Sequence, residues 1–188
     1  MTALRSLAAI LLLVSLCACE SSRDESELIV DPQTLESMSD EEVEELVVNH
    51  AYANLEGRYG DVTKILETLQ PGTRAVYLTW ILEGEVNNGG FHQYYWNTGG
   101  RFAADTVDAF QYFGLEQHAE LMQEANAVFR EEAAVMARFQ RLNTMQGLLD
   151  FHEITRLNQF DDRSYLLDEL SPLRAAMIRA MPEDFLRR

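Results

Sequence analysis

The chain has 188 residues, with 15 basic and 31 acidic side chains and a formal net charge of −16 at pH 7. A charge of that sign repels phosphates, so we expect no nucleic-acid binding. The two cysteines, Cys17 and Cys19, both lie near the N-terminus, which leaves no later cysteine for a disulfide, a zinc site or a nucleophile.

Residues 1–18 have the layout of a signal peptide. Arg5 supplies a positive charge, and an almost unbroken apolar stretch follows over residues 7–16. That stretch is much shorter than the roughly 20 apolar residues that a membrane-spanning helix needs. We therefore do not expect it to remain as a transmembrane anchor.

The boundary Leu16-Cys17-Ala18-Cys19 resembles the bacterial lipobox. The resemblance implies cleavage after Ala18, lipidation of Cys19 and attachment to the lipid bilayer in the bacterial cell envelope, facing the periplasm or the cell surface. The alternative is an ordinary secretory signal cut at the same bond, which Leu16 fits poorly because that site prefers small residues. A chain cleaved there loses one basic and no acidic residue, so its net charge is −17.

Residues 19–38 are expected to form a flexible acidic tether behind the lipidated cysteine. The segment is rich in Ser, Asp and Glu and has few large apolar residues, so burial does not offset the entropy of ordering it. We interpret its charge as solvation and repulsion from anionic headgroups, with recognition of a basic partner as the alternative.

Residues 39–188 are expected to form a single compact all-α domain of several helices, because apolar residues recur there at intervals of three and four without sustained alternation. Ser39 and Glu42 have the spacing of a capping box, and Thr73 suits the start of a later helix. We expect helices over residues 39–56, 62–69, 73–86, 91–97, 102–113, 115–141, 145–157, 164–170 and 172–181.

The most distinctive segment is residues 83–100, which is dense in Gly, Asn and aromatic side chains. Gly89 and Gly90 permit a tight reversal between two helices. The free amides at the start of the second helix attract negative charge, and Glu85 or Asn88 is near enough in sequence to supply an acceptor. The segment therefore predicts a rigid corner.

Two interpretations of this corner remain open. In the structural one, its polar groups cap helix ends, while Phe91, Tyr94 and Tyr95 share an apolar face that fills the core. In the functional one, the corner holds a pocket that binds a small ligand or catalyses a step, with Glu85 and His92 as the acid/base pair. The pocket would be lined by Glu85, Phe91, His92, Gln93, Trp96 and Asn97.

Other chemistry has no support in the sequence. The four histidines show no HExxH or comparable ligand spacing, and we expect no metal site. A Gly-rich nucleotide loop after a strand and a GxSxG nucleophile elbow are both missing from the pattern. We accordingly expect no cofactor and no enzymatic activity.

Residues 85–97 resemble the signature of the DNA-mimic protein family, which is Glu-x-x-Asn-Gly-Gly-Phe-x-Gln followed by aromatic residues and Asn. The matching positions are Glu85, Asn88, Gly89, Gly90, Phe91, Gln93 and Asn97. The similarity extends through residues 109–114 and 161–185 and covers about residues 40–186. It implies an all-α domain whose surface carboxylates imitate DNA phosphates and occupy a DNA-binding protein, an activity of the cytoplasm, whereas this chain carries an export signal.

A carboxylate array attracts a basic protein in any compartment, so we expect a non-enzymatic, lipid-anchored interaction module with a basic protein partner of unknown identity. A small-ligand or enzymatic domain and a purely structural envelope protein are the alternatives, and a solvated helix face is the plainer interpretation of the acidic residues. The candidate surface consists of Glu116, Glu120 and Glu124, at helical spacing, with Asp161, Asp162, Asp168 and Glu169, and with Glu131 and Glu132 beyond.

Overall fold

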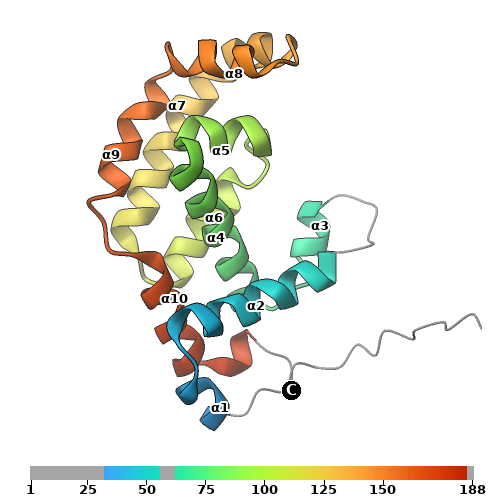
Figure 1. Ribbon diagram of the computed structural model, residues 1–188, viewed down its shortest axis with the longest axis vertical. Helices are drawn as coiled ribbons and strands as arrows, with labels where there is room; N and C mark the ends of the chain where they lie inside the picture. The colour runs from blue at the N-terminus through green and yellow to red at the C-terminus, as the bar shows by residue number, and fades with distance from the viewer. Residues whose placement is uncertain (1–31, 56–61, 186–188) are drawn as a thin grey trace, which may run out of the picture.

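A computed structural model describes residues 32–55 and 62–185 of the chain (Figure 1). The predicted signal peptide, Cys19 and residues 20–31 of the predicted tether lie outside the described residues. Every regular element within the described ranges is a helix, which confirms the predicted all-α class.

The α-helices are α1 (Pro32–Ser37), α2 (Asp40–Leu55), α3 (Val62–Leu66), α4 (Pro71–Gly89), α5 (Phe91–Thr98), α6 (Ala103–Tyr112), α7 (Glu116–Gln140), α8 (Met145–His152), α9 (Asp161–Ser164) and α10 (Leu170–Ala180). Two short 3-10 helices, η1 (Arg156–Phe160) and η2 (Pro182–Asp184), precede α9 and follow α10.

Helix α4 is the centre of the fold, because α2, α5, α6 and α10 all pack against it. The longest helix, α7, packs against α6 on the far side, and α8 lies at the opposite end of the molecule from α2 (Figure 1). The core between these helices is apolar and includes the fully buried side chains of Val76, Tyr94, Phe110 and Ala125.

The start of α2 carries the predicted capping box. The backbone N–H of Ser39 donates to Glu42 Oε2 at 2.8 Å, and the backbone N–H of Glu42 donates to Ser39 Oγ at 3.2 Å. These reciprocal bonds satisfy two of the amides that a helix N-terminus leaves free. Helix α2 then buries Val43, Val47 and Ala51, the face expected from their spacing.

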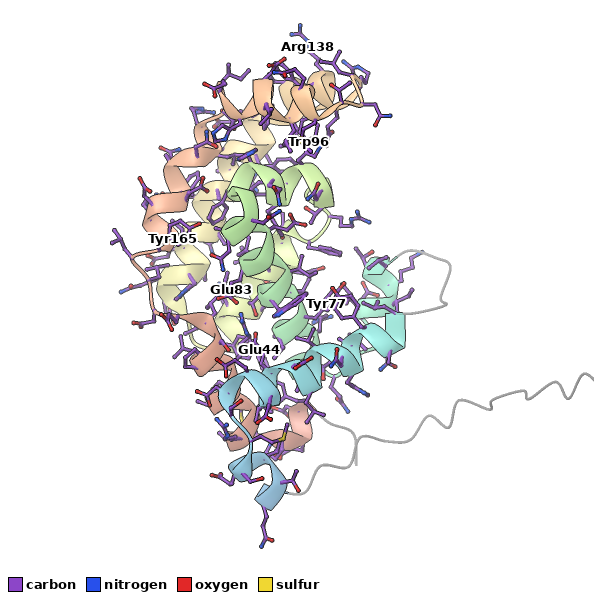
Figure 2. All side chains as sticks on the ribbon, in the orientation of Figure 1. Glu44, Tyr77, Glu83, Trp96, Arg138 and Tyr165 are labelled. Atoms are coloured by element: carbon purple, nitrogen blue, oxygen red, sulfur yellow. The ribbon has the colours of Figure 1, made fainter. Side chains whose placement is uncertain are left out.

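A buried ion triad joins three helices that are far apart in sequence. Arg174 of α10, only 1% exposed, contacts the carboxylates of Glu44 on α2 and Glu83 on α4. The hydroxyl of Ser171 donates a second contact to Glu44. Figure 2 labels Glu44 on α2 and Glu83 on α4, which lie close together where the two helices meet. The triad fixes how these three helices meet.

The structure corrects the predicted end of the tether. Residues 32–37, which we expected to be flexible, form α1, and Leu35 is 1% exposed against the core. Arg179 of α10 secures the connection to α2, because its guanidinium donates to the carbonyl oxygens of Leu35 and Met38 and pairs with Asp40. A single well-placed leucine and one arginine order a segment whose composition alone favours disorder.

Helix α4 differs from its prediction at both ends. Gln70, and not Thr73, precedes the helix, with Pro71 in the first turn, and the Thr73 hydroxyl donates to the carbonyl oxygen of Phe185 instead. At the other end the helix continues through the expected break and includes Gly89. Asn and Gly are weak helix formers but do not forbid a last turn whose other face is buried.

The C-terminal helices also differ in part from their predicted bounds. The helix expected over 145–157 ends at His152, because the Thr155 hydroxyl accepts from the Leu157 amide and starts η1. No helix spans 164–170, since α9 ends at Ser164 and α10 begins at Leu170. Proline is tolerated only in the first turn of a helix, so Pro172 requires a new start just before it.

Candidate interaction surface

The corner between α4 and α5 turns at Gly90. Its backbone φ is +91°, a conformation that favours glycine, and a Cβ there would lie 2.4 Å from Asp161 Oδ2. That carboxylate caps α5, because Asp161 Oδ1 accepts from the backbone N–H of Phe91 at 2.8 Å. The acceptor that we expected from Glu85 or Asn88 therefore comes from the start of α9, 70 residues away in sequence.

The polar residues of the 83–100 segment bond to one another. Glu85 Oε2 accepts from Gln93 Nε2 and from Asn97 Nδ2, both at 2.8 Å. Glu85 lies on α4 and the two amides on α5, so the carboxylate joins the helices on either side of the corner. Asn88 is exposed near the end of α4. These contacts give Glu85, Gln93 and Asn97 a common role in holding the corner.

His92 is turned away from this group and lies against α8. It is 5% exposed, and its Nδ1 lies 3.3 Å from Nδ1 of His152, with the two ring centroids 4.5 Å apart. Burial, followed by the nearby His152 ring, lowers the pKa of His92 from 6.5 to about 4. At neutral pH His92 is an uncharged ring whose partner is another histidine, and Glu85 has different partners.

The aromatic residues of α5 form the apolar face that their spacing predicts. Phe91, Tyr94 and Tyr95 are at most 2% exposed. The Tyr95 hydroxyl donates to Asn126 Oδ1 at 2.6 Å, and its ring stacks on Phe129 with 4.4 Å between centroids. Burial raises the pKa of Tyr94 and of Tyr95, so both hydroxyls stay protonated at neutral pH.

The carboxylates of the predicted acidic surface lie on two adjacent elements. Glu116, Glu120 and Glu124 are exposed on the first half of α7, and the segment 161–169 runs beside them (Figure 1). Two contacts hold the segment there. Arg163 pairs with both oxygens of Glu124 at 2.7 and 3.0 Å, and His118 Nε2 lies 3.1 Å from the Asp168 carbonyl oxygen.

Apart from Glu131 and Glu132, the predicted surface has seven carboxylates, and two of them have structural partners, since Glu124 is paired with Arg163 and the half-buried Asp161 caps α5. The other five are exposed, and in the described part of the chain no cation lies within ion-pairing distance of them. We call these five the acidic surface: Glu116, Glu120, Asp162, Asp168 and Glu169.

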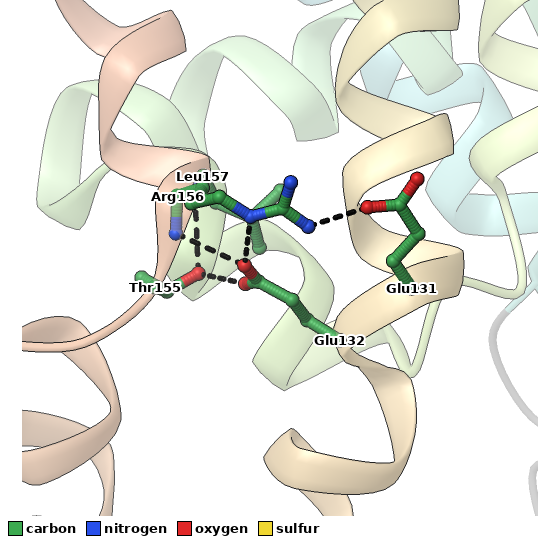
Figure 3. Close-up of polar contacts among 5 residues, drawn as sticks. All are labelled: Glu131, Glu132, Thr155, Arg156 and Leu157. Atoms are coloured by element: carbon green, nitrogen blue, oxygen red, sulfur yellow. Dashed lines mark hydrogen bonds and ion pairs between the residues drawn. The ribbon is translucent and has the colours of Figure 1, made fainter.

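The remaining carboxylates of α7, those of Glu131 and Glu132, both form ion pairs with Arg156 (Figure 3). Arg156 Nη2 lies 2.5 Å from Glu131 Oε2, and Arg156 Nε lies 2.9 Å from Glu132 Oε1. The hydroxyl of Thr155 donates to the second oxygen of Glu132 at 2.6 Å. Glu131 and Glu132 therefore tie η1 to α7, and the acidic surface ends before them.

The sequence predicted Asp161 only as a surface acid. It did not identify Arg163 as the partner of Glu124 or His152 as the partner of His92. No local pattern carries this information, because each contact joins residues at least 39 positions apart. Within residues 32–55 and 62–185 there is no group of three or more His, Cys, Asp or Glu side chains placed to hold a metal ion. The helices of those ranges include none that is long and apolar enough to cross a membrane.

Comparison with known proteins places much of the chain in one family model. The family model described as DMP19-like protein matches residues 67–181, which contain the 83–100 corner, all of α4 to α10 and the acidic surface. No curated protein and no solved structure matches the chain.

Proposed function

The chain belongs to the DMP19-like protein family, and from that premise we propose that it is a lipid-anchored protein of the bacterial cell envelope whose acidic surface binds a basic protein. Membership of this family fits a DNA-mimic-like protein, whose surface carboxylates take the place of DNA phosphates in contact with a DNA-binding partner. We propose that this chain also recognises its partner by charge, but in the cell envelope.

The observation that carries the proposal is the set of five exposed carboxylates on α7 and the 161–169 segment. Glu116 and Glu120 are one helical turn apart, about 6 Å along the axis, and the segment that bears Asp162, Asp168 and Glu169 is fixed beside them. Carboxylates without nearby cations produce a negative potential that attracts a basic surface and speeds its association.

The location in the envelope rests on residues 1–19 and their resemblance to a lipoprotein signal. Lipidated Cys19 would hold the domain at the bilayer, and the acidic residues that follow it would be repelled by anionic headgroups. The repulsion favours an orientation in which the folded domain stands away from the lipid and its acidic surface is accessible to a partner.

We propose binding and not catalysis because the candidate acid/base pair has other partners. Glu85 accepts two amide hydrogen bonds, and His92 lies against His152. General acid/base catalysis needs two titratable groups that face the same reacting atom. The contacts of Glu85 and His92 favour a corner that orients α5 and, through Asp161, the segment carrying the acidic surface.

The anchor is tested by mass spectrometry of the N-terminal peptide from protein extracted from membranes. We expect a peptide that begins at Cys19 and carries the mass of a lipid, and we expect Cys19→Ala to lose both the modification and the membrane association. An unmodified peptide that still begins at residue 19 would mean plain secretion and would remove the anchor from the proposal.

The binding function is tested by capture of partners from an envelope extract on the immobilised protein at increasing salt. We expect a basic protein that is retained at low ionic strength and released as salt shortens the Debye length below about 8 Å. Retention that does not change with salt would contradict recognition through exposed carboxylates.

A further inference from the structure

A pocket of about 390 Å³ opens between α4, α7 and the 164–171 segment. Figure 2 labels Glu83 and Tyr165, which lie on two of the elements that enclose it. Of the seven positions that match the family signature, only Phe91 lines this pocket. Glu85, His92 and Gln93 do not line it. It is therefore distinct from the pocket considered from the sequence.

The walls of this pocket are mainly apolar. Their side chains come from α4, α5, α6, α7, α9 and α10 and from the connection between α9 and α10. The apolar lining includes Leu82, Val86, Phe91, Phe110, Leu121 and Met122. A cleft of a few hundred Å³ with apolar walls and a few polar groups is the usual form of a small-molecule site.

The charged side chains that line the pocket are all carboxylates, namely Glu83, Asp168 and Glu169. His118 also lines it, and burial, its largest influence, lowers the pKa of the ring below 6.5, so at pH 7 the ring is uncharged. Asp168 and Glu169 are exposed beside the opening. The pocket therefore presents negative charge to anything that enters it.

The nearest buried cation does not reverse this charge. Arg174 contacts Glu83 and is 1% exposed, but it also contacts Glu44, so one positive charge is shared by two carboxylates. The triad has a net charge of −1 when these groups are ionised. The net negative charge of this triad and the charges of Asp168 and Glu169 repel an anionic ligand and attract a cationic one.

We propose that the pocket is a binding site for a small organic cation, one that places an apolar body among the leucine, valine and phenylalanine walls and an ammonium group beside Asp168 and Glu169. The pocket shares Asp168 and Glu169 with the acidic surface, whereas Glu116, Glu120 and Asp162 do not line it. Variants of those three residues and of the pocket wall therefore separate the cation site from the protein-binding function proposed above.

The test uses the full chain and three probes of similar shape and different charge: 4-phenylbutylamine, 4-phenylbutanol and 4-phenylbutyrate. Calorimetric titration gives each dissociation constant, and the melting temperature reports binding to the folded state. We expect the amine to bind about tenfold more tightly than the alcohol and the carboxylate not to bind. Asp168→Asn and Glu169→Gln should each weaken the amine about two- to fivefold, because exposed ion pairs are weak.

Two further variants locate the site. Asn87 is an exposed residue of the pocket lining on α4, so Asn87→Trp should block the pocket without disturbing the core and abolish amine binding. Gln111→Trp places the same ring on an exposed position of α6 outside the lining and should leave the constant unchanged. Equal binding of amine and alcohol, or amine binding that survives Asn87→Trp, would overturn the inference.

The outcomes also separate this site from the protein-binding function. If Asn87→Trp loses the amine but still captures the basic protein, an accessible pocket is not required for partner capture although the two sites share Asp168 and Glu169. If no amine binds to the folded full chain, the cation site is refuted while partner capture remains a separate measurement.

Discussion

The carboxylate of Asp161 accepts a hydrogen bond from the backbone amide of Phe91 at 2.8 Å and lies against Gly90. This contact joins the start of α9 to the start of α5. The corner helix α5 and the segment that carries three of the five carboxylates of the acidic surface are thereby positioned together. The conformation of Gly90 makes the approach possible, because a side chain there would occupy the place of the carboxylate.

The cap predicts a difference between two substitutions of Asp161. Asp161→Ala leaves the Phe91 amide unpaired and should lower the free energy of unfolding by about 1 kcal/mol, whereas Asp161→Asn keeps an acceptor and should cost less. Burial raises the pKa of Asp161 above 3.8, so the folded state holds this proton more tightly than the unfolded chain, and the free energy of unfolding falls as pH rises through the raised pKa. The cap itself persists, because the ionised carboxylate still accepts the amide hydrogen bond. Urea unfolding at several pH values measures both effects, and equal losses for Ala and Asn would argue against the cap.

Gly90→Ala should be strongly destabilising. The substitution combines a backbone conformation that L-residues avoid with a Cβ 2.4 Å from Asp161, and we expect a loss of about 2 kcal/mol or more. Gly84→Ala is the matched control, because Gly84 lies in α4 with no neighbour within 4 Å and should gain about 0.5–1 kcal/mol. Similar unfolding midpoints for the two variants would contradict the geometry of the corner.

The buried triad predicts that Arg174 cannot be replaced alone. Arg174→Met leaves Glu44 and Glu83 without their cation and should cost about 3–5 kcal/mol. Adding Glu44→Gln and Glu83→Gln to Arg174→Met removes the uncompensated charges and should recover at least half of the loss. Denaturant titrations of the single and triple variants measure this, and a triple variant no more stable than the single one would show that charge is not the cause.

The histidine pair makes stability depend on pH. The folded-state pKa of His92, lowered to about 4, lies below the unfolded value of 6.5, so the folded form binds fewer protons. Its contribution is therefore present above pH 6.5 and is lost as pH falls from 6.5 to about 4, by on the order of 2 kcal/mol. His92→Phe keeps an aromatic ring against His152 and should make the melting temperature depend less on pH between 6.5 and about 4. An unchanged pH profile would exclude His92 as the source.

Much of the fold follows from local pattern. Val43, Val47 and Ala51 recur at helical spacing and are all buried, and the Ser39–Glu42 capping box forms as predicted. Periodicity succeeds for these elements because a helix depends on residues within one or two turns of each other. The apolar face of α5 was predictable for the same reason.

The partners of the polar residues were not predictable in this way. Asp161 and Glu83 reach residues 70 and 91 positions away, and nothing in their own neighbourhood distinguishes a cap or a buried ion pair from an exposed acid. Leu35 likewise gave no local sign that α10 would bury it. Tertiary contacts determine the partners and the burial of these residues, and those contacts cannot be predicted from a local sequence pattern.

Crosslinking in intact cells tests most directly whether the acidic surface binds a basic envelope protein, as we propose. Three versions of the full chain are compared: the unaltered protein, a surface variant and a control variant in which three exposed carboxylates elsewhere are neutralised. The surface variant carries Glu116→Gln, Glu120→Gln and Asp162→Asn, and the control carries Glu41→Gln, Glu45→Gln and Glu67→Gln.

Mass spectrometry identifies and quantifies the captured proteins. We predict a basic envelope protein that the unaltered chain and the control capture equally and that the surface variant captures about tenfold less, as expected for three lost charge pairs. Equal capture by all three would contradict the acidic surface, and capture of a cytoplasmic DNA-binding protein would contradict the location in the envelope.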